Sequence, residues 1–95
     1  MGDDRPMKPR LTFEEHVEMG RALASVRDEL LRRNVQLANA YPQSGPPAVP
    51  AKKLDQAMRA VEAARTELEN ALYREHPDTA ETTVYYPHSE DRVRF

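Results

Sequence analysis

The chain has 95 residues, a formal net charge of −2, 32% charged residues and no cysteine. This length allows one domain at most, and the absence of cysteine excludes disulfide bonds and thiolate chemistry. The small negative charge removes any bulk attraction to nucleic acids or anionic membranes.

Residues 1–10 are polar and lack the apolar core of a signal peptide, and we expect them to form a flexible N-terminal segment. No stretch approaches the ~20 apolar residues that a membrane span needs. The expected location is therefore the cytoplasm. Arginine outnumbers lysine 11 to 3 and isoleucine is absent, a bias that indicates a GC-rich bacterial genome.

Residues 11–41 are predicted to form the first helix. Thr12 is followed three residues later by Glu15, which is the spacing of a capping box. Pro42 ends the helix, because a residue before proline is biased away from the α conformation. Gly20 indicates either a close crossing or the ordinary tolerance of a helix for glycine. Apolar residues recur at helical spacing at Phe13, Val17, Leu23, Val26, Leu30, Leu37 and Tyr41.

Residues 42–50 are predicted to be a connector, because four of the nine are proline. Such a segment cannot lie inside a helix, and it is stiffer than a Gly/Ser linker. We expect it to turn the chain through about 180°, so that the two amphipathic helices cover each other.

Residues 51–76 are predicted to form the second helix, with a heptad pattern that indicates a packed helix. Leu54, Val61 and Leu68 occupy one seam position, and an alanine line occupies the other. Small side chains at every seventh position allow a partner helix to approach closely. The alanine line is Ala57, Ala64 and Ala71.

The predicted fold is all-α, an antiparallel two-helix hairpin that dimerises into a four-helix bundle. One hairpin leaves a face of each helix uncovered, and a core of this size rarely suffices alone. Basic residues gather toward the connector and acidic residues toward the open end, which favours an antiparallel dimer. The predicted seam residues are Leu23, Leu30, Leu37, Leu54, Ala57, Val61, Ala64, Leu68 and Ala71.

The sequence predicts no catalytic, cofactor-binding or metal-binding residue. His16 and His76 have no second ligand at the i, i+3 or i, i+4 spacing of a metal site, and His88 has only Asp91 three residues on. There is no glycine-rich phosphate loop and no nucleophile motif. The pairs Arg32–Arg33 and Lys52–Lys53 form only a modest basic patch without interleaved aromatics, so nucleic-acid binding is not favoured.

Residues 77–95 are predicted to be an extended or strand-like C-terminal tail. The run from Thr82 to Tyr86 has the β-branched and aromatic composition of a strand. A lone strand is unstable, so the segment docks on the bundle, pairs with a partner, or frays as many termini do. The predicted partner-binding residues are Val84, Tyr85, Tyr86 and Phe95.

In outline, the chain resembles the WXG100 proteins exported by type VII secretion, which are helical hairpins of similar length. Tyr86 and Glu90 match their C-terminal Tyr-x-x-x-Asp/Glu pattern, but the Trp-x-Gly turn is absent because the chain has no tryptophan. We expect a non-enzymatic interaction or adaptor protein that needs no cofactor. The alternatives are a secreted hairpin of the resembled kind and a small nucleic-acid-associated regulator.

Overall fold

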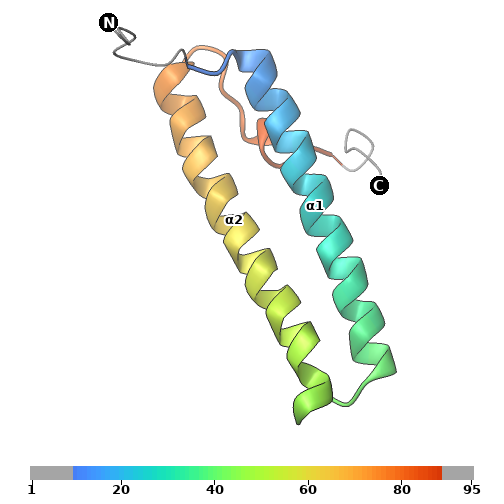
Figure 1. Ribbon diagram of the computed structural model, residues 1–95. Helices are drawn as coiled ribbons and strands as arrows, with labels where there is room; N and C mark the ends of the chain where they lie inside the picture. The colour runs from blue at the N-terminus through green and yellow to red at the C-terminus, as the bar shows by residue number, and fades with distance from the viewer. Residues whose placement is uncertain (1–9, 89–95) are drawn as a thin grey trace, which may run out of the picture.

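The computed structural model describes residues 10–88 and is all-α. Helices α1 (Phe13–Ala40) and α2 (Val49–Glu75) run antiparallel and pack on each other, and a connector with a short 3-10 helix, η1 (Pro46–Ala48), joins them (Figure 1). A second 3-10 helix, η2 (Thr82–Val84), follows α2. The predicted hairpin is confirmed, with helix ends within two residues of the expected ones. Within the described residues, neither helix is long and apolar enough to cross a membrane.

Helix α1 begins with the predicted capping box. The backbone N–H of Glu15 donates to Thr12 Oγ1 at 3.0 Å, and the backbone N–H of Thr12 donates to Glu15 Oε1 at 2.8 Å. These two bonds satisfy donors that a helix start otherwise leaves unpaired. The helix ends at Tyr41, whose extended backbone precedes Pro42 as expected.

The connector is shorter than predicted, because α2 begins at Val49 rather than at residue 51. Pro50 lies in the first turn of α2, where a proline is tolerated since the first N–H groups of a helix have no partner within it. Gly45 has a φ of +76°, a left-handed conformation that suits glycine, and it leads into η1.

The inner face of α2 keeps one predicted seam line and shifts the other by one residue. It runs through Val61, Arg65, Leu68 and Leu72, at spacings of four, three and four residues. Arg65 and Leu72 are the buried residues next to the predicted alanine line, and Ala64 is exposed. The other predicted seam residues are partly buried: Leu23, Leu30, Leu37, Leu54, Ala57, Val61, Leu68 and Ala71.

The chain beyond α2 folds back between the helices, which divides the hairpin into two halves (Figure 1). We call α1 residues 13–26 with α2 residues 62–75 the open half, and α1 residues 27–40 with α2 residues 49–61 the loop half. The returning segment, residues 77–88, covers only the open half. Every buried residue of the two helices lies there: His16, Gly20, Ala24, Ser25, Arg65 and Leu72.

The prediction of a strand-like segment is wrong for Thr82–Val84, which form η2. No neighbouring strand is available in residues 10–88, and the turn pairs its backbone groups locally instead. Val84 N–H donates to Glu81 O and Tyr86 N–H to Thr82 O, each at 3.1 Å. The turn also buries Val84 and Tyr85, which form a core cluster with Leu72.

Gly20 is the point where this segment crosses α1. A Cβ atom at Gly20 would lie 1.9 Å from the carbonyl oxygen of Val84 and 3.0 Å from Tyr85 Cα. The backbone of the returning segment therefore rests directly on the backbone of α1. Of the two interpretations of Gly20, the close crossing is confirmed, and the crossing element is the C-terminal segment.

Candidate functional site

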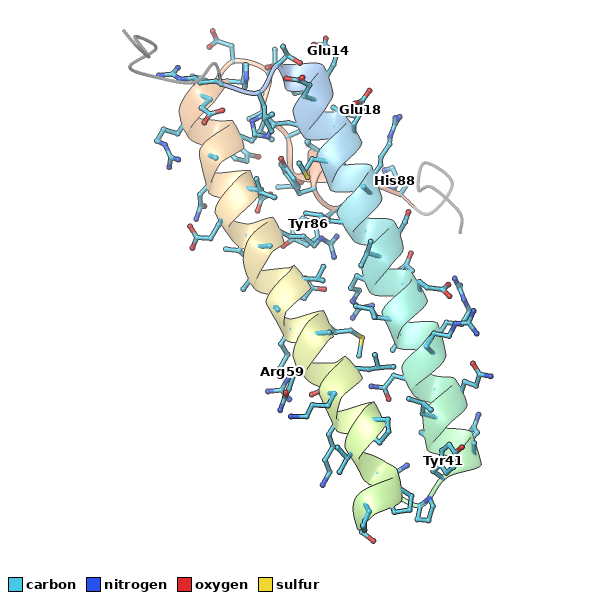
Figure 2. All side chains as sticks on the ribbon, viewed as in Figure 1. Glu14, Glu18, Tyr41, Arg59, Tyr86 and His88 are labelled. Carbon is cyan, nitrogen blue, oxygen red and sulfur yellow. The ribbon has the colours of Figure 1, made fainter. Side chains whose placement is uncertain are left out.

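Arg65 holds the returning segment against α2. Its Nε and Nη2 donate to the backbone carbonyl of Tyr85 at 3.1 and 2.7 Å, and its guanidinium lies 4.2 Å from the ring centroid of Tyr86. The side chain is only 3% exposed, and Glu62 accepts from its Nη1 at 3.3 Å. A buried arginine with three hydrogen bonds and a stacked ring is a structural anchor. Figure 2 shows Tyr86 between the two helices.

A row of hydrogen-bonded polar side chains lies beneath the returning segment and links that segment to α1 and α2. His16 of α1 is 1% exposed and Tyr85 is 0% exposed. The Tyr85 hydroxyl lies 2.5 Å from His16 Nδ1, and Glu75 Oε1 at the end of α2 lies 3.2 Å from His16 Nε2. The histidine is thereby fixed between a phenol on one nitrogen and a carboxylate on the other.

His76 completes the cluster. It is the residue at which α2 ends, and its backbone is no longer helical. Its Nε2 lies 2.9 Å from the carbonyl oxygen of Leu11, and its ring meets that of His16 edge-on with centroids 5.6 Å apart. One coordinating atom each from His16, Glu75 and His76 lies within 4.8 Å of the other two.

The Tyr85 hydroxyl does not have the properties of an activated nucleophile. Burial, with a smaller contribution from the Glu75 carboxylate, raises the pKa of Tyr85 to about 12. An activated hydroxyl needs a lowered pKa and access to substrate, and Tyr85 has neither. The Tyr85–His16–Glu75 arrangement is therefore suited to locking the segment in place.

The loop half carries an open groove on the face that the returning segment covers in the open half. Ala38 lies eighteen residues after Gly20, about five helical turns, and thus on the same side of α1. The groove has a volume of about 490 Å³. Its apolar lining is Leu37, Ala38, Tyr41, Pro42, Pro47, Ala48 and Ala51.

Large apolar side chains next to this groove are exposed. Leu31 is 41% exposed and Val35 is 51% exposed, and with Ala38 they follow the i, i+4, i+7 spacing of one helical stripe. Tyr41 is 51% exposed beside the connector, where Figure 2 labels it. We call Leu31, Val35, Ala38 and the groove lining the loop-half surface.

The basic patch is weaker than the sequence indicates. Glu29 accepts hydrogen bonds from both Arg32 and Arg33, and these bonds lower the pKa of the Glu29 carboxyl. Within residues 10–88, Lys52 and Lys53 have no carboxylate partner.

The predicted tail residues are placed differently from one another. Val84 and Tyr85 are buried in the chain's own core, so in this structure they face no partner, whereas Tyr86 is partly exposed. Phe95 and Glu90 lie outside the described residues. Nothing in the sequence indicated a polar cluster at Arg65, Glu75 or Tyr85. Local spacing does not reveal the cluster of His16, Glu75 and His76, because 59 residues separate His16 from Glu75.

Comparison with known proteins gives no relative from which a role could be transferred to this chain. No family model, no curated protein and no solved structure matches this chain.

Proposed function

We propose that this protein is a non-enzymatic helical interaction protein whose first partner is a second copy of itself. The observation that carries the proposal is the loop-half surface, which joins an exposed apolar stripe of α1 to an open groove of mixed polar and apolar lining. An exposed apolar face of this kind marks an interaction site, and a second hairpin that covers it makes a four-helix bundle. The predicted seam residues supply the inner faces of that bundle.

The charge distribution favours an antiparallel dimer. Lys52 and Lys53 lie at the loop end without a carboxylate partner in the described part of the chain. Glu14 and Glu18 lie at the other end of the molecule (Figure 2). An antiparallel pairing brings the loop end of each copy toward the open end of the other, so that opposite charges approach. Exposed pairs contribute little affinity, and the arrangement selects orientation.

The adaptor role extends from the same architecture. A dimer of this kind is a cytoplasmic scaffold without a cofactor, and the exposed ring of Tyr86 is available to a further protein partner. Burial of Val84 and Tyr85 restricts that second contact to the outer side of the segment. We therefore assign self-association to the loop half and partner recognition to the outer side of the tail.

Light scattering coupled to gel filtration tests the dimer. At micromolar concentration we expect a mass of ~22 kDa, twice the 10.9 kDa of one chain. Leu31→Glu and Val35→Glu should each shift the protein to a folded monomer, because a carboxylate on the stripe would be buried without a partner. Gln36→Glu adds the same charge on the opposite, exposed side of α1 and should leave the dimer intact. A monomeric wild type at 100 µM or above would overturn the proposal.

A further inference from the structure

We propose that His16, Glu75 and His76 form a binding site for a divalent zinc-class cation that closes the open end of the hairpin. The site goes beyond the proposed interaction function and does not depend on it. Four features of the cluster support the site: the donor atoms, their spacing, the hydrogen bonds that orient the rings, and the position of the three residues in the fold.

The donor set is two imidazoles and one carboxylate. Nitrogen ligands of this kind suit zinc and related transition metals, and two histidines with a glutamate are a known zinc set that keeps a fourth position for water. Calcium and magnesium prefer six or more oxygen ligands, and this cluster offers a single carboxylate. The chemistry therefore selects a transition-metal dication over the hard cations.

The spacing requires only a small contraction. Ligand atoms about 2.0–2.1 Å from a tetrahedral zinc ion are roughly 3.3 Å from one another. His16 Nε2 and Glu75 Oε1 are already 3.2 Å apart, and the third donor completes a triangle whose sides are at most 4.8 Å. The remaining shortening falls to His76, whose backbone has already left the helical conformation.

In each imidazole ring, the nitrogen that would not bind the ion already has a hydrogen-bond partner, as metal-binding histidines require. A ligating imidazole usually donates its second N–H to a carbonyl, carboxylate or other fixed acceptor. The Leu11 carbonyl can only accept, so His76 Nε2 carries the proton and Nδ1 is left with a free lone pair. The Tyr85 hydroxyl can accept a hydrogen bond from His16 Nδ1–H. His16 Nε2 is then available to the ion, which takes the place of a proton shared between Nε2 and Glu75.

The three residues come from the start of α1 and the end of α2, which meet at the open end of the hairpin. His16 lies in the first turns of α1, and Glu75 and His76 lie at the end of α2. Tyr85 connects the same site to the returning segment. An ion here would join elements that are about 60 residues apart in the chain and would stabilise the folded state by mass action. Glu75 is 20% exposed, which gives the ion a way in from solvent.

Zinc binding can be measured directly on protein stripped with a chelator. We expect one Zn²⁺ per chain by calorimetric titration, and a melting temperature that rises by roughly 10 °C or more at zinc concentrations 100 times the Kd. Glu75→Gln keeps the shape and an acceptor for His16 but removes the charged ligand, and His76→Gln removes an imidazole. Each should weaken zinc binding by at least tenfold.

His88→Gln is the matched control, since it removes an exposed histidine that lies outside the cluster, and it should bind zinc as the wild type does. Tyr85→Phe keeps all three ligands and should weaken binding by about tenfold through the lost orienting group. The helicity of each variant is checked by circular dichroism at 222 nm. If His76→Gln loses helicity, the zinc affinity of Glu75→Gln decides whether the site is present.

Three results would overturn the site: no saturable 1:1 binding by the wild type, unchanged affinity in both ligand variants, or equal loss in His88→Gln. The dimer and the metal site fail separately. Leu31→Glu breaks the proposed dimer contact and lies outside the cluster, so the monomeric variant should still take up one zinc ion.

Discussion

The open half and the loop half of the hairpin use the same two helices, but only the open half has a third segment packed on it. In the open half, the returning chain buries Tyr85 and Leu72 completely, and it is held by Arg65. No residue of the loop half, 27–40 and 49–61, is buried, and the connector beside it buries only Ala48. The apolar stripe of α1 is exposed there. Two helices alone therefore do not make a core, and a third element is needed.

The halves also differ in how polar groups are used. The open half places an arginine, a histidine and a tyrosine inside, each with hydrogen-bond partners, which fixes one arrangement of the returning segment. The loop half has a single cross-helix bond from a side chain to the backbone, from Asn34 Nδ2 to the Ala51 carbonyl at 3.1 Å. Specific polar anchors thus accompany the covered half, and generic apolar surface accompanies the uncovered half.

Removal of residues 81–95 should have the largest effect, because it deletes the cover of the open half. The structure places Val84 and Tyr85 of this segment in the core cluster. We expect the truncated chain to lose several kcal/mol of stability, on the scale of one or two large core side chains. Thermal unfolding followed by circular dichroism measures this. A truncated chain that melts like the full one would show that the returning segment contributes nothing to the core.

Gly20→Ala should be the next most harmful change. The new Cβ would overlap the Val84 carbonyl, and since both sides are backbone, the segment must lift away from α1. We expect a loss of about 3 kcal/mol, although alanine is the better helix former by ~1 kcal/mol. Arg21→Ala, one residue along on an exposed site, is the control and should be near neutral. Urea denaturation of both variants gives the comparison, and a Gly20→Ala protein as stable as the control would contradict the close crossing.

Raising the pH should weaken the open half through Tyr85. The pKa of Tyr85 is about 12 in the folded chain against about 10 in the unfolded chain, so the fold prefers the neutral phenol. Its contribution is complete below pH 10 and is lost as the pH rises from 10 to 12, by at most about 2–3 kcal/mol. The measurement is urea denaturation between pH 8 and 11.5 in the presence of a chelator.

Tyr85→Phe is the control for this pH dependence, because phenylalanine has no proton to lose. Wild type and variant should therefore approach each other in stability as the pH rises. Parallel curves for the two proteins would mean that other groups cause the alkaline loss.

Arg65→Met should have a smaller effect because two contributions oppose each other. Methionine removes both donors from the Tyr85 carbonyl and leaves a buried acceptor unpaired, which costs about 1–3 kcal/mol. It also removes a buried charge, which is itself unfavourable. We expect a net loss of about 1–2 kcal/mol in urea denaturation. Arg59→Met on the exposed side of the same helix is the control.

The sequence predicted the local features of the fold and missed the long-range ones. The capping box at Thr12, the end of α1 before Pro42 and the helical periods are set within a few residues, so pattern alone was enough. The contact of Arg65 with the Tyr85 carbonyl spans 20 residues, and that of His16 with Glu75 spans 59. Nothing in local spacing encodes such contacts. Gly20 was the single local signal of the crossing.

Ala64→Leu should have the smallest effect, and it distinguishes the two descriptions of α2. A strict heptad places Ala64 in a close contact, where a leucine would cost ~1–3 kcal/mol. In the structure the neighbouring line of Arg65 and Leu72 is buried instead, and Ala64 is exposed beside Arg65. We therefore expect a change within about 0.5 kcal/mol, as for the exposed neighbour Ala63→Leu, measured by urea denaturation at a concentration where the chain is monomeric. A clear loss for Ala64→Leu alone would restore the heptad register. A loss that appears only at concentrations where the chain self-associates would place the alanine line at the contact between copies.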